Sequence, residues 1–294
     1  MQLVALDWGT SSLRGALLTA GGHVLDERCF ARGILTVEKG DFPAVFESCF
    51  GDWMQPRVLC LIAGMAGSQQ GWMEAPYCPC PAGFSDIAAQ LVWVETGRIA
   101  IVPGLSVDTD GIPDVMRGEE TQVFGALQLL GIQAARLVLP GTHSKWVSVS
   151  NGCITDFSTW MTGEFYALLS RHSILERTLP STDTPHDEAA FKQGVACALN
   201  GDGLLHTAFS ARTLSLFKRM ASDALPSYLS GLVIGEELKY QQLKRGDSVV
   251  VVGAECLANK YAQALQQLNV TAQCLGRQAA WQGLRKIADT LNPP

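Results

Sequence analysis

The stretch MQLVALDWGTSSLR (residues 1–14) decides the fold. In it, an apolar run ends in Asp7, a short polar turn follows, and a second apolar run begins at once, a spacing that predicts a β-hairpin. Gly9 lets a ligand approach the backbone of the turn, and Thr10 and Ser11 offer N–H and O–H donors. Because Asp7 can hold Mg²⁺ through its water shell, the stretch suits metal and phosphate. Taken alone, it is more typical of an ordinary hairpin with a polar tip.

The same pattern returns halfway along the chain. The run RLVLP (residues 136–140) predicts a strand and GTHSK (residues 141–145) a turn, and a second strand then leads to the hairpin signal Asn151-Gly152. This doubling predicts two related domains, residues 1–130 and residues 131–294, each with a Gly-Thr turn. Two such turns are expected to hold one nucleotide from opposite sides.

A third unit lies near the C-terminus. Residues 248–252 predict a buried strand that ends in Gly253-Ala254 and leads into a helix. Such a unit can bind an adenine or ribose, because glycine has no side chain and lets the flat base lie close to the backbone. An ordinary βα unit without a ligand has the same sequence pattern. The last helix, residues 278–287, is free to pack back on the first domain.

The helix that precedes this unit contains Gly231 and Gly235, four residues apart. Glycine inside a helix costs about 1 kcal/mol relative to alanine, so the pair indicates that another backbone packs closely there.

A candidate sugar-binding loop follows the apolar run of residues 57–63. That run is typical of a strand covered on both faces, and in α/β folds ligands bind at the carboxyl ends of such strands. In the loop, Gly67 leaves room, Ser68 and Gln69 can hydrogen-bond hydroxyl groups, and Trp72 can stack on a sugar ring. A flexible glycine-rich connection is an equally good explanation.

Acidic residues open a predicted helix. After a polar loop, the run MRGEETQ (residues 116–122) precedes an apolar helical pattern. Glu119 and Glu120 there would each interact favourably with the helix dipole by about 0.3–1 kcal/mol. A carboxylate in this position that faces a cleft can instead act as a general base.

Composition limits the class of protein. The 294 residues are 47% hydrophobic and 17% charged, which is typical of a compact protein of two domains. The net charge of −6 argues against nucleic acid as the main partner, and the longest uncharged run, residues 58–73, is interrupted by Gly, Ser and Gln and predicts no membrane span. Nine irregularly spaced cysteines are typical of reduced thiols in a cytoplasmic protein, and Cys78-Pro79-Cys80 favours a rigid loop over a metal site.

In this order, the pieces resemble the acetate/sugar kinase, Hsp70 and actin superfamily. The matching pieces are residues 7–11 with Arg14 (first phosphate motif), residues 139–143 (second phosphate motif), Gly253-Ala254 with its helix (adenosine motif), and the helices with Gly125-Ala126 and with Gly231 to Gly235 (connecting helices). The resemblance implies an α/β fold of two ribonuclease-H-like domains, the actin-like ATPase fold, with a nucleotide cleft between them.

A closer resemblance is to the 2-dehydro-3-deoxygalactonokinases. The runs that carry it are LDWGTSSLRG, AGMAGSQQGW, VMRGEETQ, LPGTHSKWV, DFSTWMTGE and SGLVIGEE. These bacterial enzymes phosphorylate 2-dehydro-3-deoxy-D-galactonate at O6, using ATP, in galactonate catabolism. The resemblance implies the same reaction here, with ATP and Mg²⁺ as cofactors.

The resemblance also implies a role for each candidate residue. The ATP phosphates would lie on residues 9–11 and on Gly141, Thr142 and His143, Asp7 would organise Mg²⁺, Arg14 or Lys145 would offset phosphate charge, and Gly253 and Ala254 would carry the adenosine. The sugar acid would lie on residues 67–72, with its carboxylate paired to Arg117.

The general base is expected near the start of the first connecting helix, where related carbohydrate kinases have an Asp. This chain has Glu119 and Glu120 there, so the match is one of position and chemistry. We expect one of these two to accept the hydroxyl proton, ahead of Asp156 on the strand after the second turn.

Two other functions stay open. One is a kinase for another sugar acid or a ketose, and the other, of a different class, is a non-catalytic actin-like nucleotide switch. The short chain and the polar loop of residues 67–72 argue against the switch. The expected partners are a small sugar acid and ATP, with no membrane, and a homodimer is a further option.

Overall fold

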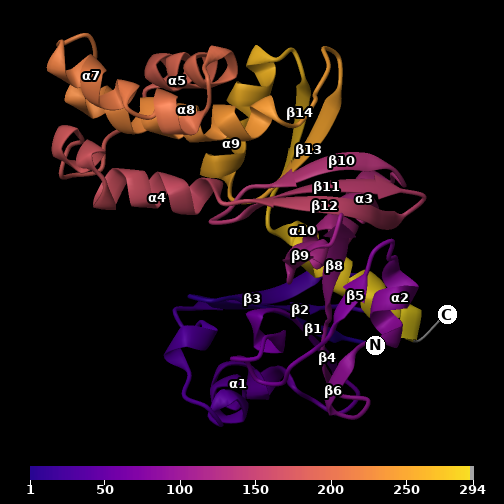
Figure 1. Cartoon of the computed structure of the whole chain (residues 1–294). Helices are drawn as coiled ribbons and strands as arrows, with labels where there is room; N and C mark the ends of the chain where they lie inside the picture. The colour runs from indigo at the N-terminus through magenta and orange to yellow at the C-terminus, as the bar shows by residue number, and fades with distance from the viewer. Residues whose placement is uncertain (292–294) are drawn as a thin grey trace. The chain divides into compact units, whose positions relative to one another are not determined.

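The computed structural model describes residues 1–291, which form two compact units (Figure 1). Unit 1 consists of Met1–Leu137, Val147–Thr159 and the segment from Leu275 onward, and unit 2 consists of Val138–Trp146 and Trp160–Cys274. No helix within the described residues has the length and apolar character needed to cross a membrane.

Three sheets carry the strands. The six-stranded sheet has the order β3 (Val24–Phe30), β2 (Leu13–Leu18), β1 (Leu3–Trp8), β4 (Leu59–Gly64), β7 (Ile99–Ile101) and β6 (Val92–Glu95). The five-stranded sheet has the order β12 (Cys153–Trp160), β11 (Ser144–Ser150), β10 (Ala135–Leu139), β13 (Ser248–Val252) and β14 (Thr271–Leu275). The small sheet has the order β5 (Tyr77–Pro79), β8 (Gly104–Thr109) and β9 (Ile112–Met116).

The helices cover these sheets. The α-helices are α1 (Phe42–Phe50), α2 (Phe84–Ala89), α3 (Glu119–Leu130), α4 (Thr162–His172), α5 (Glu188–Asn200), α6 (Leu204–Thr207), α7 (Ser210–Leu216), α8 (Leu225–Lys239), α9 (Glu255–Gln267) and α10 (Gln278–Leu291). Short 3₁₀ helices occupy Ile34–Thr36, Gly51–Trp53, Met65–Gly67, Ile174–Thr178 and Ser222–Ala224.

The same strand order occurs in both large sheets. In both large sheets the first three strands form a meander and the fourth lies beside the first, so β3-β2-β1-β4-β7 has the same order as β12-β11-β10-β13-β14. A Gly-Thr turn joins the first two strands in each sheet. The α/β fold and its duplicated ribonuclease-H-like sheet therefore follow the expectation.

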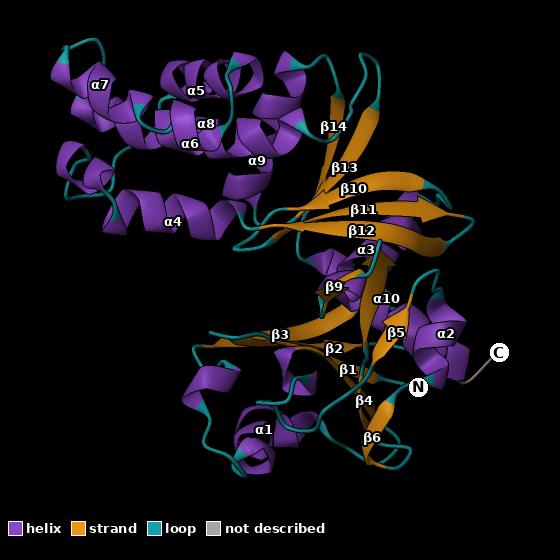
Figure 2. Ribbon diagram, in the orientation of Figure 1, coloured by secondary structure: helices purple, strands orange, loops and turns teal. Residues whose placement is uncertain are grey.

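The opening run of the sequence forms the centre of its sheet. β1 pairs antiparallel with β2 and parallel with β4, and its apolar residues are buried on both faces. On one face, Trp8 packs with Phe42, Phe46 and Phe50 of α1 (Figure 2). On the other face, α10 packs against α3 and contacts β1 and β4. Because side chains alternate along a strand, Asp7 belongs to this second face.

Unit 2 has its own core. β13 contributes Val249 and Val251, and the helices contribute side chains such as Phe191 of α5 and Tyr261 of α9. α5 and α8 lie side by side in Figure 1 and pack closely.

The close packing predicted at Gly231 and Gly235 is confirmed. A Cβ atom at Gly231 would lie 2.2 Å from the carbonyl oxygen of Phe191, and one at Gly235 would lie 2.9 Å from the carbonyl oxygen of Val195. The backbone that approaches α8 is therefore that of α5.

The segment before Met116 differs from the polar loop that we expected. It forms the β8–β9 hairpin, whose turn contains Asp110 at φ +54° and Gly111 at φ +81°. The Asp108 carboxylate accepts a hydrogen bond from the Gly111 N–H at 2.8 Å. An Asp-Gly pair is a hairpin signal, because both positions need positive φ.

Candidate active site

The carboxyl ends of β1 and β4 bring Asp7 beside Gly64 in unit 1. The two strands pair in parallel, with Asp7 opposite Ala63 and Trp8 opposite Gly64. Gly64 has φ +91°, and a Cβ atom there would lie 2.8 Å from the carbonyl oxygen of Trp8 and 3.3 Å from Oδ1 of Asp7. Glycine therefore keeps the space beside the Asp7 carboxylate open.

Two arginines act on the carboxylate of Asp7. Arg14 lies directly opposite Asp7 across the β1–β2 hairpin, and Arg277 immediately precedes α10. Burial raises the pKa of Asp7, whereas the positive charges of Arg14 and Arg277 lower it. In the described part of the chain, the Asp7 carboxylate accepts no hydrogen bond, and Nε of Arg14 is buried without a partner. Both groups can therefore still bind a metal ion, its water shell or a phosphate.

The turn after β1 presents backbone donors. The Gly9 N–H donates to the Ser12 carbonyl at 2.9 Å, and the carbonyls of Gly9 and Thr10 accept hydrogen bonds from the backbone of residues 34–35. These hydrogen bonds hold the backbone of the turn in place. The N–H groups of the exposed Thr10 and Ser11 donate to no acceptor among residues 1–291, so they are available to an anion.

The start of α3 lies against the end of β4. A Cβ atom at Gly118, whose φ is +107°, would lie 3.1 Å from Cα of Gly64. Glu119 is partly buried, and its Oε2 accepts a hydrogen bond from the Arg117 N–H at 3.0 Å. Glycine at both contact positions thus lets the Glu119–Glu120 pair approach the strand end that also holds Asp7.

The two glutamates differ in their surroundings. Glu120 is fully buried, its Oε2 accepts a hydrogen bond from the Gly118 N–H at 2.6 Å, and its Oε1 has no partner among the described residues. Burial and, to a smaller extent, the charge of Glu119 raise the pKa of Glu120 to about 8. Glu120 therefore holds a proton at neutral pH, whereas Glu119 is the member of the pair that reaches the surface.

Arg117 connects the start of α3 with the candidate sugar-binding loop. A Cβ atom at Gly67 would lie 2.7 Å from Nη1 of Arg117, and Nη2 of Arg117 donates to the Ala75 carbonyl at 2.7 Å. The guanidinium lies over the Tyr77 ring, 4.3 Å from its centre. Nε and Nη1 are buried and have no partner in the described structure. The arrangement leaves the N–H groups of Nε and Nη1 without an acceptor in the described structure.

The loop itself is tightly wound. The Ser68 hydroxyl donates to the Met65 carbonyl at 2.8 Å, and Gln69 is exposed. Trp72 is half-buried, with its ring centre 6.0 Å from that of Trp8 and 5.5 Å from that of Phe46. Part of the Trp72 indole therefore belongs to the core beneath the loop.

Asp156, the alternative base, has different neighbours. It is exposed on β12, and its charge, after burial and Cys78, contributes to a pKa of about 12 for Cys80. Cys78 accepts a hydrogen bond from Nε2 of Gln90 at 3.0 Å, and burial raises its pKa too. Both thiols are therefore protonated at neutral pH, and no group of three or more metal-ligating side chains occurs among residues 1–291.

In unit 2, the turn after β10 contacts the start of α4. A Cβ atom at Gly163 would lie 2.4 Å from the carbonyl oxygen of Gly141, and the Glu164 N–H donates to the Thr142 carbonyl at 3.0 Å. Nε2 of His143 and Oε2 of Glu164 are 2.5 Å apart. The N–H groups of residues 141–143 donate to no acceptor within the described chain, as in the first turn. Each unit thus carries one fixed turn with available backbone donors.

The candidates for the adenosine motif lie beside the carboxyl end of β10. A Cβ atom at Gly253 would lie 3.6 Å from the carbonyl oxygen of Pro140, the residue before the turn. Ala254 is the residue before α9. Lys145, in contrast, is only 6% exposed at the start of β11 and interacts within the protein.

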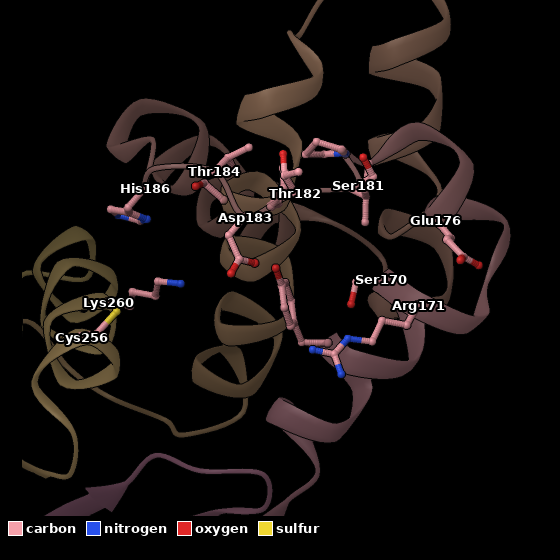
Figure 3. A pocket seen from close by; sticks show the side chains of 15 residues that line it. Ser170, Arg171, Glu176, Ser181, Thr182, Asp183, Thr184, His186, Cys256 and Lys260 are labelled. Carbon is pink, nitrogen blue, oxygen red and sulfur yellow. The ribbon is translucent and has the colours of Figure 1, made fainter.

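A cavity of about 770 Å³ opens beside α9 in unit 2 (Figure 3). Figure 3 shows the loop from Ser181 to His186 on one side and Cys256 and Lys260 of α9 on another, with Asp183 between them. Its other lining residues are Tyr166, Ser170, Arg171, Glu176, Leu179, Pro180, Pro226 and Ser227. A volume of this size is sufficient for a nucleoside or another small polar molecule.

Comparison with known proteins identifies the family. The family model described as 2-keto-3-deoxy-galactonokinase matches residues 7–287. The chain belongs to this family of carbohydrate kinases. It is 36% identical over 288 residues to the 2-dehydro-3-deoxygalactonokinase of Escherichia coli (strain K12), with 97% of each chain covered. Membership of a kinase family implies the use of ATP and of a small sugar substrate.

Solved structures agree with this family. A crystal structure from Sinorhizobium meliloti, assigned as a 2-dehydro-3-deoxygalactonokinase, matches with a TM-score of 0.91 and 34% identity over 99% of this chain and 100% of that one. The fold alone is shared with the activator of the 2-hydroxyisocaproyl-CoA dehydratase from Clostridium difficile, described with bound ADPNP (TM-score 0.53, 12% identity, coverage of 99% and 96%). The predicted actin-like ATPase fold is therefore confirmed.

Some residues of the candidate site in this 2-keto-3-deoxy-galactonokinase family member were not predicted from the sequence. Tyr77 supports Arg117 from a strand about forty residues upstream, and Arg277 reaches Asp7 from the C-terminal segment. The loop from Ser181 to His186 lines the cavity, although its sequence indicated only a break between helices. All three depend on contacts between distant segments, for which the sequence has no local signal.

Proposed function

We propose that the chain transfers the γ-phosphoryl group of ATP to O6 of 2-dehydro-3-deoxy-D-galactonate, as a cytoplasmic enzyme of galactonate catabolism. The observation that carries this proposal is the family match over residues 7–287, which spans every candidate site residue. Phosphoryl transfer needs positioning and charge stabilisation more than covalent chemistry, so the roles below concern binding and proton transfer.

The two Gly-Thr turns are the proposed phosphate-binding elements. Available N–H groups at Thr10 and Ser11 in unit 1 and at residues 141–143 in unit 2 suit the oxygens of a polyphosphate. Arg14 would offset charge on the transferred group, because its Nε has no partner among the described residues. Lys145 is the second candidate for that role, although its low exposure favours Arg14.

Asp7 is the proposed magnesium residue. Mg²⁺ keeps several waters and usually takes one or two protein carboxylates together with substrate phosphates, so a single carboxylate without a hydrogen-bond partner fits it. When bound, the ion would neutralise phosphate charge. Asp7 would orient it from the end of β1, with Gly64 keeping the space beside the carboxylate open.

The cavity beside α9 is the proposed nucleoside site. Gly253 and Ala254 immediately precede the helix that contributes Cys256 and Lys260 to the cavity wall. A nucleoside in the cavity would thus lie at the start of α9, next to the strand end that carries the second phosphate turn.

The loop of residues 67–72 and Arg117 form the proposed sugar-acid site. Nε and Nη1 of Arg117 have no partner among residues 1–291, so N–H groups of this guanidinium are available to a substrate carboxylate. Ser68 and Gln69 would bind hydroxyl groups. Trp72 would shape the floor of the loop, since its indole packs partly into the core.

Glu119 is the proposed general base. It lies at the helix start that contacts Gly64 and is partly exposed, whereas Glu120 is enclosed and protonated at neutral pH. A base must reach the hydroxyl whose proton it accepts, which favours Glu119. Asp156 remains the alternative.

Separate amide variants test the base. We expect Glu119→Gln to lower kcat by about 10²- to 10⁴-fold, because general base catalysis contributes that much. Nucleotide affinity should stay the same, as measured by calorimetry with Mg-ADP. If Asp156→Asn alone abolishes turnover while Mg-ADP still binds, Asp156 is the base and the choice of Glu119 is wrong.

A coupled assay of ADP release tests the function as a whole. The purified protein is given Mg-ATP with 2-dehydro-3-deoxy-D-galactonate, with related aldonates and with ketoses, and kcat/KM is compared. We expect the first substrate to be preferred. A higher value for another acid or ketose would change the substrate, and ATP-dependent filaments without sugar turnover would indicate a nucleotide switch.

A further inference from the structure

One buried carboxylate in unit 2 connects several elements of the proposed ATP site. Glu237 of α8 is only 1% exposed. Its Oε1 accepts a hydrogen bond from Nε1 of Trp146 at 2.6 Å. Its Oε2 accepts one from the Tyr261 hydroxyl at 2.7 Å and another from Oγ1 of Thr162. The Tyr261 hydroxyl also lies 2.9 Å from Oγ of Ser144.

Each donor belongs to an element that adjoins a proposed ATP-binding group. Ser144 and Trp146 begin β11, directly after the turn of residues 141–143. Thr162 is the first residue of α4, and the next residues, Gly163 and Glu164, contact that turn.

The remaining donor comes from the nucleoside side. Tyr261 lies on α9, one residue after Lys260, which lines the cavity. The carboxylate of Glu237 is thus the common acceptor for the strand after the second phosphate turn, for the helix that contacts this turn and for the helix after Gly253-Ala254.

Stability alone does not explain this arrangement. Burial raises the pKa of Glu237, and the hydrogen bonds from Thr162, Tyr261 and Trp146 lower it. Removing a carboxylate from water is costly, and apolar side chains of similar volume often give equal or greater stability at such positions. The hydrogen bonds instead fix distances between elements, because each donor has one direction in which it bonds well.

We propose that Glu237 is a positioning residue of the ATP site, which holds the turn of residues 141–143 at a fixed distance from α9. This inference rests on the proposed function, in which that turn binds phosphate and the cavity beside α9 binds the nucleoside. Glu237 itself touches neither. Its hydrogen bonds act through Thr162, Trp146 and Tyr261.

The test removes one donor at a time and measures nucleotide affinity separately from sugar affinity. Thr162→Val removes the hydroxyl, and we expect it to raise the Kd for Mg-ADP and the KM for ATP by about tenfold, as for loss of a hydrogen bond to a charged group. Thr162→Ser keeps the hydroxyl and should restore both values to within about twofold of wild type. The KM for the sugar acid should not change in either variant.

Tyr261→Phe and Tyr228→Phe form a matched pair. Both tyrosines are buried in unit 2 and bond a serine hydroxyl, Ser144 and Ser210 respectively, but only Tyr261 donates to Glu237. We expect Tyr261→Phe to weaken Mg-ADP binding and Tyr228→Phe to leave it unchanged. Glu237→Gln places an amide N–H donor among the existing donors. In the folded variant, we expect it to weaken Mg-ADP binding more than Thr162→Val or Tyr261→Phe does.

The contradicting result is a loss of thermal stability in Thr162→Val and Tyr261→Phe with an unchanged Kd for Mg-ADP, which would make the cluster structural only. Calorimetry with Mg-ADP needs no sugar turnover. A wild-type protein that binds Mg-ADP but does not phosphorylate the sugar acid would therefore contradict the proposed function and not this inference.

Discussion

Arg117 depends on an aromatic neighbour for its orientation. Its guanidinium lies over the ring of Tyr77, while Nη2 is held by the Ala75 carbonyl. Because Tyr77 is 40% exposed, the contact can be altered without opening the core. The ring fixes the plane of the guanidinium, and that plane decides in which directions its N–H groups can donate to a carboxylate.

Replacement of Tyr77 tests this at the scale of one residue. We expect Tyr77→Leu to raise the KM for the sugar acid by about fivefold, the value of a modest cation–π contact, with the KM for ATP unchanged. Tyr77→Phe keeps the ring and should behave like wild type. Equal KM values for the leucine and phenylalanine variants would show that the ring does not orient Arg117.

Glu120 should make stability depend on pH. Its pKa is about 8 in the folded protein, against an ordinary value of 4.5, so the folded state binds a proton that the unfolded state has lost. The stability associated with this proton is therefore fully present below the ordinary pKa and is lost as the pH rises through the folded value.

The variant Glu120→Gln removes this titration while keeping an oxygen for the Gly118 N–H. We expect the Tm of the variant minus that of wild type to increase steadily between about pH 5 and about pH 9. The measurement is differential scanning fluorimetry across that range, with the exposed Glu38→Gln as a control for loss of a charge. A difference that stays constant with pH would contradict the assignment.

At the scale of elements, pairs of helices pack closely against each other at glycine residues. In unit 1, a Cβ atom at Gly125 of α3 would lie 1.6 Å from the carbonyl oxygen of Ala279 on α10, and one at Gly283 would lie 1.8 Å from that of Thr121. In unit 2, Gly231 of α8 approaches α5 in the same way. These contacts fix how close the helices lie, and α3 also carries Glu119 at its start.

A methyl group at this crossing should force the helices apart. We expect Gly125→Ala to lower the free energy of unfolding by about 3 kcal/mol, because the close atom is backbone and cannot turn away. Gly21→Ala, where the nearest atom is 3.6 Å away, should stay within about 0.5 kcal/mol of wild type. Urea denaturation measures both, and equal stability of the two variants would contradict the packing.

The elements also show what the sequence can and cannot predict. The β1–β2 hairpin, its repeat at β10–β11 and the glycine crossing of α8 were predicted, because each has a local signal in strand pattern or glycine spacing. The β8–β9 hairpin was missed, because its Asp110-Gly111 turn lies among polar residues that resemble a loop. The strand β14 was also missed, since its TAQCL sequence has only weak strand character.

For the candidate site too, some features could be predicted from the sequence and others could not. The strand-end turns and the acidic helix start were predicted from their motifs, while the choice between Glu119 and Glu120 required burial, which adjacent residues in one helix turn do not reveal. The support of Arg117 by Tyr77 and the Glu237 cluster join segments distant in sequence. Only the folded chain brings them together.

At the scale of the whole molecule, one strand order occurs twice, and each unit carries a Gly-Thr turn with available N–H groups. The groups proposed for the sugar acid and for proton transfer belong to unit 1, and the cavity beside α9 belongs to unit 2. In the proposed function, the duplicated sheet would thus supply a phosphate-binding turn in both units, and the loops beyond the strands would give each unit its own ligand.

The most direct test of the central claim is ³¹P NMR of the reaction mixture. With Mg-ATP and 2-dehydro-3-deoxy-D-galactonate, the account predicts ADP and an equal amount of a new phosphomonoester, whose phosphorus couples to the two protons on C6. ADP with inorganic phosphate alone, unchanged ATP, or a phosphomonoester on another carbon would contradict it.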